Sequence, residues 1–245
     1  MSRRPHIVLL VGTLAVGGTE TQLVLLAQNL SKRNFKVTVW TLCDEGPLRQ
    51  ILENNGISTF YPDIPIKGSF HFKHLFTTKF LSNLWRLFRF LKKEKPDIVH
   101  TFLPENNAVG GFVAELAGIK IRIASRRNRN HHRKQKPLFT HFEDWINRRA
   151  TLILGNSRAV LNDLINEGID AERLGMIYNG VQTERFKGLD RNSSRLDFGL
   201  ELHELCLAVV ANFHPRKRHV DLLEALAQIK TSLPNQWVLF LVGRD

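Results

Sequence analysis

Apolar runs alternate along the chain with segments in which apolar residues recur every three or four positions. Ile7–Val11 is a continuous run rich in β-branched residues, which is typical of a strand buried on both faces of a parallel sheet. A glycine-bearing loop follows, and Thr21–Arg33 then carries leucine and alanine at helical spacing. Because Lys36–Leu42 is again strand-like, this start of the chain predicts a β-α-β unit with a right-handed crossover.

The same alternation continues to residue 178 and predicts one complete domain. We expect further strands at Ile57–Tyr61, Asp97–Thr101, Ile119–Ser125, Leu152–Leu154 and Gly175–Tyr178. We expect helices at Pro47–Asn55, 73–93, Asn107–Ala117, 137–149 and from an N-capping Ser157 to Glu167. Strands that alternate with helices over this length are typical of an α/β fold with a doubly wound, Rossmann-like parallel sheet.

A second unit is predicted after a break in the pattern. Residues 183–204 are polar and irregular, which is typical of a linker. A new strand, helix and strand follow at Leu205–Ala211, His219–Thr231 and Trp237–Val242. Because three elements cannot bury both faces of a parallel sheet, we expect this second domain to be incomplete. The predicted organisation is therefore a complete domain at 1–182, a linker at 183–204 and the start of a second Rossmann-like domain at 205–245.

Positive charge is concentrated in the middle of the chain. The formal net charge is +12, and residues 67–150 hold 18 Lys and Arg against 6 Asp and Glu, which equals the whole excess. Such a zone suits an anionic partner, whether a phospholipid surface, a nucleic acid or a phosphorylated substrate. Within it, residues 67–95 combine Phe, Leu and Trp with Lys and Arg on one predicted helix. That pattern is typical of an interfacial helix on anionic lipid, and the alternative is a surface helix whose apolar stripe packs on the sheet.

The cysteines and the lengths of the apolar runs indicate in which cellular compartment the protein is expected. Cys43 and Cys206 lie far apart without a CxxC partner, so neither a disulfide framework nor a zinc site is predicted. Arg3 and Arg4 precede an apolar run, but that run breaks at Gly12, which disfavours a secretory signal. No run reaches the roughly 18 apolar residues of a membrane-spanning helix. We therefore expect a cytoplasmic protein, which the basic zone would place peripherally at the inner membrane face.

The first loop, Gly12–Thr19, nearly has the spacing of a phosphate-binding P-loop. Gly18 stands where that motif requires a lysine, so a nucleoside triphosphatase is excluded, and the loop is not a dinucleotide fingerprint either. Gly17 and Gly18 still allow a ligand to approach the backbone and the N-terminus of the following helix. The alternative is a tight turn with packing glycines.

Polar side chains follow two predicted strands at the edge where open α/β sheets bind ligands. His100 ends the strand 97–101, where an imidazole can hydrogen-bond a sugar hydroxyl or transfer a proton, and a structural histidine is the alternative. Asn107 follows closely and is a candidate for a hydroxyl contact. Arg126 and Arg127 begin a cationic run that suits phosphate or lipid head groups, with a solvated basic loop as the alternative. The paired histidines of that run are poor metal ligands because the surrounding cations oppose a further cation.

The turn after the strand 205–211 is the strongest indication of a nucleotide in the residues themselves. It carries three consecutive cations, Arg216, Lys217 and Arg218, directly before a predicted helix. Cations and a helix N-terminus both favour a phosphate group, so we expect a phosphate site at this turn.

In their order along the chain, these segments resemble the retaining glycosyltransferases of family 4, which have the GT-B fold of two Rossmann-like domains. The resemblance rests on Gly17-Gly18-Thr19-Glu20, on PDIVHT at 96–101, on SRRN at 125–128, on Asn156-Ser157 before a helix, on YNGV at 178–181 with Phe186, and on ANFHPRK at 211–217 before DLLEAL at 221–226. It runs along the whole chain, and the ordered set is specific although each motif alone is weak.

The resemblance implies transfer of a sugar from a UDP- or GDP-linked sugar to a glycan or lipid-linked acceptor, with retention, in the synthesis of cell-surface polysaccharide or glycolipid. It implies neither a metal nor a cofactor, with the nucleotide sugar serving as donor substrate. The N-terminal domain would mainly hold the acceptor and the second domain the donor. Taken together, the residue patterns and this resemblance make His100 the catalytic candidate. The donor-phosphate candidates are Gly17, Gly18, Asn212, Arg216 and Lys217, and the acceptor or sugar candidates are Glu20, Asn107, Arg126 and Arg127.

The chain departs from the family pattern in several places. Asn212 stands where many relatives have an arginine, Phe102 where many have a second histidine, and Arg218 where a glycine is usual. The acidic E-x(7)-E segment that grips the donor sugar in the family would lie beyond Asp245, so we expect a truncated chain that is weakly active or inactive alone. The alternatives are a non-catalytic basic Rossmann module that binds anionic membrane or nucleic acid, and a sugar-nucleotide epimerase. No RNA-binding motif or recognition helix stands out, so a nucleic-acid partner is not expected.

Overall fold

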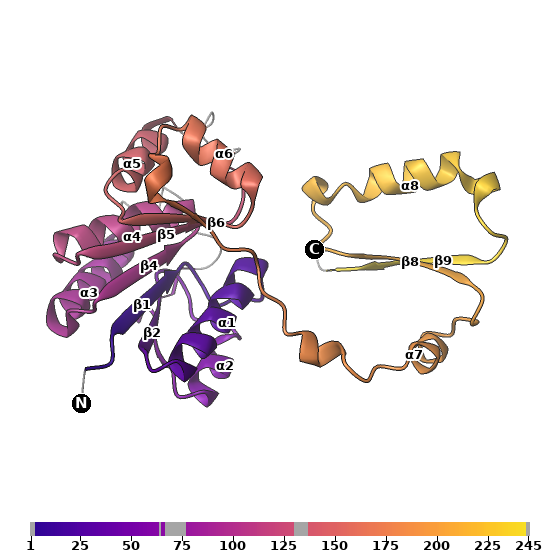
Figure 1. Ribbon diagram of the computed structural model, residues 1–245, viewed down its shortest axis with the longest axis horizontal. Helices are drawn as coiled ribbons and strands as arrows, with labels where there is room; N and C mark the ends of the chain where they lie inside the picture. Colours follow the sequence, from indigo (N-terminus) through magenta and orange to yellow (C-terminus); the bar gives the residue numbers. More distant parts are fainter. Residues whose placement is uncertain (1–2, 64, 67–76, 130–136, 244–245) are drawn as a thin grey trace. The chain divides into compact units, whose positions relative to one another are not determined.

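The chain divides into two compact units, Met1–Gly180 and Val181–Asp245, in the computed structural model (Figure 1). The structure describes residues 3–63, 65–66, 77–129 and 137–243. Within the described residues, the first unit is built on a sheet of seven parallel strands in the order β3-β2-β1-β4-β5-β6-β7. These strands are β1 (His6–Val11), β2 (Lys36–Thr41), β3 (Ser58–Phe60), β4 (Ile98–Phe102), β5 (Ile121–Arg126), β6 (Leu152–Gly155) and β7 (Leu174–Met176).

The strand order reverses between β1 and β4. The chain builds β1, β2 and β3 outward on one side and then returns to place β4 beside β1, with Leu9 opposite His100. In open α/β sheets, ligands bind outside the carboxyl ends of the strands at such a switch point. The predicted doubly wound parallel sheet is therefore present, and it places His100 at the position where a ligand is expected.

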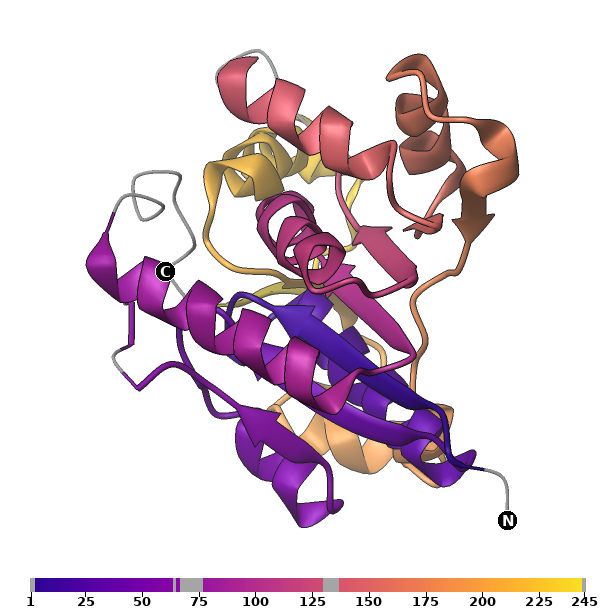
Figure 2. The same cartoon turned by 90° about the vertical axis from the view of Figure 1, so that its left-hand side faces the viewer.

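Helices cover both faces of this sheet. They are α1 (Gly18–Lys32), α2 (Arg49–Asn54), α3 (Thr78–Glu94), α4 (Pro104–Leu116), α5 (Pro137–Asn147) and α6 (Arg158–Asn166). Side chains of β1 alternate between two cores, because successive residues of a strand point to opposite faces. Leu9 shares one core with Leu23 of α1, whereas Leu10 shares the other with Leu87 of α3 and Val113 of α4. Figure 2 shows α3 running across its face of the sheet.

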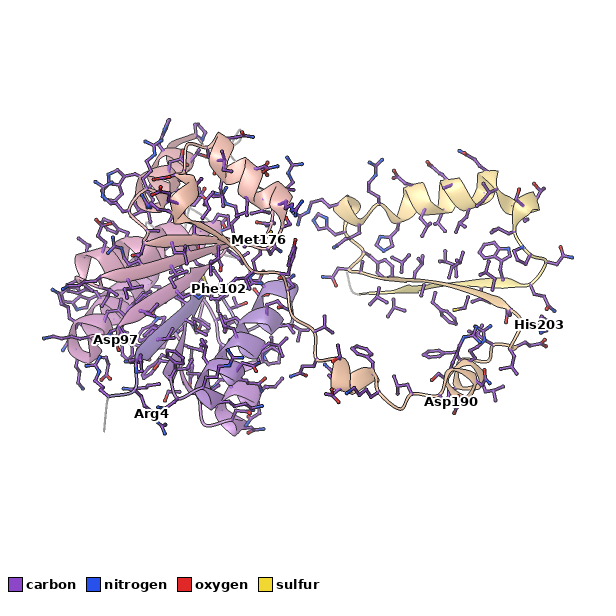
Figure 3. All side chains as sticks on the ribbon, in the orientation of Figure 1. Arg4, Asp97, Phe102, Met176, Asp190 and His203 are labelled. Carbon is purple, nitrogen blue, oxygen red and sulfur yellow. The ribbon has the colours of Figure 1, made fainter. Side chains whose placement is uncertain are left out.

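The two ends of the β4 strand differ in character (Figure 3). At the amino end, Asp97 accepts hydrogen bonds from Arg3 at 3.0 Å and from the backbone N–H of His6 at 2.7 Å, so this edge is closed by structural contacts. Phe102 marks the carboxyl end, beyond which the chain passes through Leu103 into α4. The carboxyl end is therefore the part of the sheet where the site is built.

Helix termini follow the capping residues of the sequence. Ser157 caps α6 by accepting from the backbone N–H of Val160, as predicted, and Thr77 caps α3 in the same way from Phe80. Helix α4 begins at Pro104, three residues before the predicted start at Asn107, because proline suits the first turn of a helix. The part of the predicted helix 73–93 that precedes residue 77 lies outside the described residues.

The second unit contains β8 (Leu205–Val210) and β9 (Trp237–Val242), which pair in parallel, with α8 (His219–Gln228) between them in sequence. The segment 183–204, which we expected to be irregular, contains the helix α7 (Arg191–Asp197). Asp190 caps α7 by accepting from the backbone N–H of Ser193, and the buried Arg195 donates to the carbonyl oxygens of Glu201 and Glu204. A local hydrogen-bond network therefore orders a stretch whose polar composition indicates only a linker.

Candidate functional site

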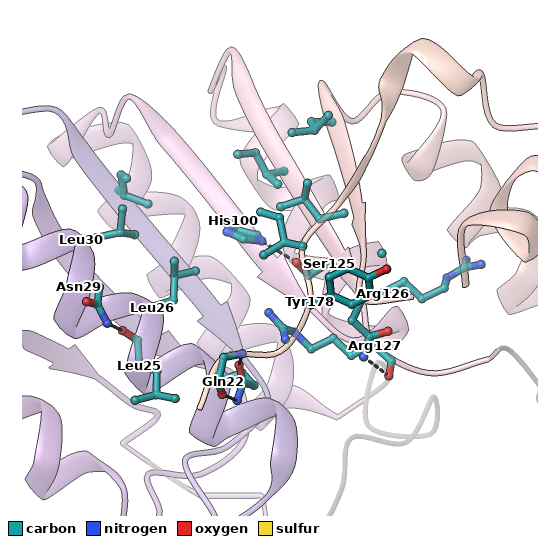
Figure 4. A pocket seen from close by; sticks show the side chains of 18 of the residues that line it. Gln22, Leu25, Leu26, Asn29, Leu30, His100, Ser125, Arg126, Arg127 and Tyr178 are labelled. Atoms are coloured by element: carbon teal, nitrogen blue, oxygen red, sulfur yellow. Dashed lines mark hydrogen bonds between the residues drawn. The ribbon is translucent and has the colours of Figure 1, made fainter. Parts of the chain in front are cut away.

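A cavity of about 470 Å³ lies in the first unit, over the strands β1, β4, β5 and β6 and beside α1 (Figure 4). Much of its lining is apolar and comes from the sheet and from α1, namely Ile7, Ile98, Ile123, Leu152, Leu154, Leu25, Leu26 and Leu30. Its polar lining includes Gln22, His100, Ser125, Arg127, Asn156 and Tyr178. The cavity therefore combines an apolar wall with a polar group drawn mainly from the carboxyl ends of the strands.

His100 is held in this lining by two contacts. Its Nε2 shares a hydrogen bond with Ser125 Oγ at 2.8 Å, and its ring stacks on Phe102 with the centroids 4.3 Å apart. Burial, with a smaller contribution from the charge of Arg127, lowers the pKa of His100 to about 3. A ring with that pKa is neutral at pH 7, so His100 can exchange a hydrogen bond with a sugar hydroxyl. The proton-transfer role expected for His100 stays a prediction.

Arg126 has a structural role rather than the expected ligand contact. Its side chain is 1% exposed, with Nη2 donating to Glu143 at 3.0 Å and Nη1 to Glu167 at 2.5 Å. A buried guanidinium between two carboxylates is already neutralised, so it has no free charge for a substrate. The structure therefore gives Arg126 a structural ion-pair role, and its expected contact with the acceptor or a sugar stays a prediction.

Arg127, the next residue, is in a different environment. Its Nη1 donates to Asn179 Oδ1 at 2.7 Å, and its guanidinium lies over the ring of Phe102 at 5.3 Å from the centroid. Asn156 in turn donates to the backbone carbonyl of Arg127 at 3.2 Å. Burial lowers the pKa of the Arg127 guanidinium, and Figure 4 shows this side chain beside Tyr178 in the cavity lining.

Asn107 does not line this cavity. It is buried in the first turns of α4, where its Nδ2 donates to the backbone carbonyl of Ser125 at 3.0 Å. This bond ties α4 to the end of β5 and so supports the strand that presents Ser125 to His100. The expected contact of Asn107 with an acceptor hydroxyl is therefore replaced by a structural contact.

The two glycines before α1 have different surroundings. A Cβ added to Gly17 would overlap the carboxylate of Glu20, which folds back over the N-terminus of the helix, whereas one added to Gly18 would meet nothing within 4 Å. Burial raises the pKa of Glu20, and its own backbone N–H partly offsets this. The helix N-terminus is therefore open on the side of Gly18, while Glu20 already occupies the side of Gly17.

The segment 177–180 is fastened to α1. The amide of Gln22 donates to the backbone carbonyl of Gly180 at 2.7 Å and accepts from the backbone N–H of Gly180 at 2.7 Å. This pair of bonds brings Tyr178 into the lining of the cavity and Asn179 to Arg127. Gln22 and Asn179 were not identified as site residues from the sequence, because their partners lie 158 and 52 positions away.

The cationic turn of the second unit is exposed. His214 caps it, since its Nδ1 accepts from the backbone N–H of Arg216 at 3.2 Å. Arg218 adopts a left-handed conformation with φ of 55° and pairs with Asp221 of α8. Among the described residues, Arg216 and Lys217 have no carboxylate partner, and Asn212 is exposed at the start of the same turn.

Across residues 3–63, 65–66, 77–129 and 137–243, no three His, Cys, Asp or Glu side chains gather as metal ligands would. In the same part of the chain, no helix combines the length and the apolar composition that crossing a bilayer requires.

Sequence and structure comparisons place this chain among known proteins. The model of glycosyltransferase family 4 matches residues 16–185. The Escherichia coli protein named UDP-Gal:alpha-D-GlcNAc-diphosphoundecaprenol alpha-1,3-galactosyltransferase is 24% identical over 219 residues, covering 86% of this chain and 55% of the relative.

Solved structures share the fold. The Anabaena protein Alr3699/HepE, in complex with UDP and glucose, matches with a TM-score of 0.76 and 22% identity, over 97% of this chain and 61% of that one. Sucrose-phosphate synthase from Thermosynechococcus elongatus matches with a TM-score of 0.72 and 18% identity, over 98% and 62%. The chain thus spans between 55% and 62% of the length of these relatives. Since the family model covers more than half of the chain, the protein belongs to glycosyltransferase family 4.

Proposed function

We propose that this chain belongs to an enzyme that transfers a sugar from a nucleotide diphosphate sugar to a lipid-linked or glycan acceptor, with retention. The family match over residues 16–185 carries this proposal. The name of the E. coli relative supports UDP as the donor nucleotide and a diphosphate-linked lipid as the acceptor. The fold alone would not support the chemistry, because Rossmann-like sheets serve many reactions.

The donor side of the proposal rests on the turn 212–217 of the second unit. Arg216 and Lys217 are exposed cations without carboxylate partners among the described residues, and they precede the N-terminus of α8. Charge-assisted hydrogen bonds from such groups hold a diphosphate and stabilise it as it leaves the sugar. Asn212 adds a neutral hydrogen-bonding group where a further cation would be usual. Gly18 leaves the N-terminus of α1 open to an anionic group.

The acceptor side rests on the cavity of the first unit. The neutral His100 and the hydroxyl of Ser125 are suited to exchange hydrogen bonds with sugar hydroxyls. Glu20, in the first turn of α1, is suited to accept a hydrogen bond from a sugar hydroxyl. No cofactor and no metal are required in this scheme, because the donor-side cations neutralise the leaving group.

The proposed enzyme works beside an anionic membrane. Helix α3 buries Phe80, Leu87 and Leu91 in the core and exposes Leu81 and Trp85 to solvent. Exposed apolar side chains on a helix with Lys92 and Lys93 in its last turn are typical of a surface that contacts anionic lipid. A peripheral position at the membrane would bring the enzyme to a lipid-linked acceptor.

Sugar-transfer assays with variants of the turn 212–217 test the proposed function. The protein expressed from its complete gene is incubated with radiolabelled UDP- and GDP-sugars and a lipid extract from its source. We expect labelled lipid to accumulate, and Arg216→Gln with Lys217→Gln to lower turnover about tenfold or more, because charge-assisted bonds to the diphosphate are lost. Lys230→Gln, at another exposed lysine of the same unit, is the matched control and is expected to leave turnover unchanged.

Two results would contradict the proposed function. Turnover that is insensitive to Arg216 and Lys217 would remove the donor site from this turn. Binding of membranes or nucleic acid without transfer from any nucleotide sugar would instead support a non-catalytic basic module.

A further inference from the structure

Three arginines lie at or just after the end of β5, and they differ in whether a carboxylate neutralises them. Arg126 is paired with the carboxylates of Glu143 and Glu167. Arg129 makes a two-bond pair with Asp163, with both N···O distances at 2.9 Å. Arg127 lies between them in sequence and has no carboxylate partner among the described residues. The fold therefore neutralises two of the three cations and leaves one unbalanced.

The unbalanced cation is partly enclosed. Nη1 of Arg127 donates to the neutral amide oxygen of Asn179, and the ring of Phe102 lies against the guanidinium. Its Nε is buried without a hydrogen-bond acceptor in the described part of the chain. Enclosing a cation without a counter-ion is unfavourable, and burial accordingly lowers the pKa of Arg127. Such an arrangement is expected where a ligand supplies the missing negative charge.

The cavity beside Arg127 offers no negative charge of its own. Among the described residues that line it there is no Asp or Glu, and the neighbouring His100 is neutral. Arg126 also lines it but is already paired with two carboxylates. Arg127 is consequently the one unbalanced formal charge of the described lining, next to the hydrogen-bonding groups of Asn156 and Tyr178.

We propose that Arg127 binds a phosphate group of the acceptor, and that it makes the enzyme specific for an acceptor whose sugar is carried on phosphate or diphosphate. This inference rests on the proposed function, because it assigns the ligand to the acceptor. A guanidinium suits phosphate because its planar N–H groups match two phosphate oxygens. The donor diphosphate has separate cations, Arg216 and Lys217, in the second unit. Arg127 belongs to the first unit, where the acceptor is proposed to bind.

Binding measurements with two probes test the assignment. Decyl diphosphate represents the acceptor and UDP represents the donor, each titrated by calorimetry into the full-length protein. We expect Arg127→Gln to lower the affinity for decyl diphosphate about tenfold or more, because one charge-assisted contact to phosphate is removed. The affinity for UDP is expected to stay within about twofold of the wild-type value. The variant Arg216→Gln with Lys217→Gln is expected to give the opposite result. Arg129→Gln, two residues from Arg127 and exposed, is the matched control that changes neither affinity.

A chemical control links the effect to the phosphate. Decyl N-acetylglucosaminide has no phosphate, and Arg127→Gln is expected to leave its affinity unchanged. The stability of the variants adds a readout that does not depend on ligand or turnover. The urea midpoint of Arg127→Met is expected to equal or exceed that of the wild type, because an unbalanced cation is removed, whereas Arg126→Met is expected to lower it by leaving two carboxylates unpaired.

Several outcomes would overturn the assignment. A phosphate contact at Arg127 would be excluded if the wild type did not bind decyl diphosphate, or if Arg127→Gln bound it with the same affinity as the wild type. An equal loss of UDP affinity in Arg127→Gln would place Arg127 in the donor site. A urea midpoint of Arg127→Met below that of the wild type would show that Arg127 is a structural residue. Failure of sugar transfer with intact, Arg127-dependent binding of decyl diphosphate would count against the proposed function and not against this phosphate site.

Discussion

Burial decides the chemistry of His100. The imidazole shares a hydrogen bond with Ser125 and stacks on the ring of Phe102, and burial lowers its pKa to about 3. Arg127 adds to this effect because a nearby positive charge disfavours the protonated ring. Neutral His100 and charged Arg127 thus form complementary groups in one cavity lining, one suited to hydroxyls and the other to an anion.

The low pKa of His100 predicts a pH dependence of stability. Between pH 6.5, the ordinary value for histidine, and about 3, the unfolded chain binds a proton that folded His100 does not bind. The free energy of unfolding therefore keeps its full value above pH 6.5 and decreases as the pH falls below it, by up to about 1.4 kcal/mol per pH unit from this residue. Urea unfolding of the wild type and of His100→Asn at several pH values between about 7.5 and 4 measures the difference.

The difference between the two proteins isolates His100 from other groups. His6 also has a pKa lowered by burial, and it contributes equally to both curves. His203→Asn, at an exposed histidine of the second unit, is expected to follow the wild type. Identical pH slopes for the wild type and His100→Asn would show that the ring is not held neutral.

The position of the site was predictable from the sequence, but the roles of individual residues were not. The ends of apolar runs locate His100 and the arginines after β5, because parallel strands present their carboxyl ends at one edge. The sequence does not distinguish Arg126 from Arg127. Successive side chains at a strand end point to opposite sides, and the carboxylates that pair with Arg126 lie 17 and 41 positions away.

At the scale of elements, hydrophobic periodicity predicted the types and order of the strands and helices of the first unit. The bounds shifted where local backbone chemistry dominates, as at Leu103, whose φ of 75° ends β4 and starts α4 at Pro104. Helix α7 was missed because its stability comes from the Asp190 cap and from Arg195, and not from an apolar stripe. The sequence predicted a doubly wound parallel sheet but not the order of its strands, because periodicity carries no information on which strands are neighbours.

The packing of α4 on the sheet predicts the effect of a single methyl group. A Cβ on Gly110 would lie 2.8 Å from Leu10 Cδ2 and 3.1 Å from Thr101 Cγ2, and Leu10 is fully buried. Gly110→Ala is therefore expected to lower the free energy of unfolding by about 1–3 kcal/mol through overpacking, after offsetting an alanine propensity gain of about 1 kcal/mol. Urea denaturation measures this change.

Gly18→Ala is the matched control for the packing of α4. It adds the same methyl group to a glycine of a helix, but at the open N-terminus of α1, so a change within about 0.5 kcal/mol is expected. Equal effects of the two substitutions would show that α4 can move away from β1 and β4 to accommodate a Cβ.

At the scale of the whole molecule, the excess of positive charge and the exposed apolar side chains of α3 occur in the same stretch of the chain. The sequence left open whether the apolar residues of this helix form core or face lipid, and the structure divides them between the core and the solvent-exposed surface. Phe80, Leu87 and Leu91 are buried, whereas Leu81 is 53% and Trp85 is 60% exposed. The buried stripe explains why the helix folds onto the sheet. Leu81 and Trp85 lie on its exposed side, where Trp85 stacks on Phe88 with the ring centroids 5.4 Å apart.

This combination predicts salt-sensitive binding to anionic vesicles. Co-sedimentation with phosphatidylglycerol-containing vesicles is expected at about 50 mM salt and should fall several-fold at about 500 mM, where charges are screened over a few ångströms. Leu81→Ala and Trp85→Ala should each weaken binding by removing apolar surface that enters the interface. Leu116→Ala, on α4 at 56% exposure, removes the same group as Leu81→Ala and should have no effect. Binding that resists salt, or that Leu116→Ala weakens equally, would mean that α3 is not the lipid-contacting surface.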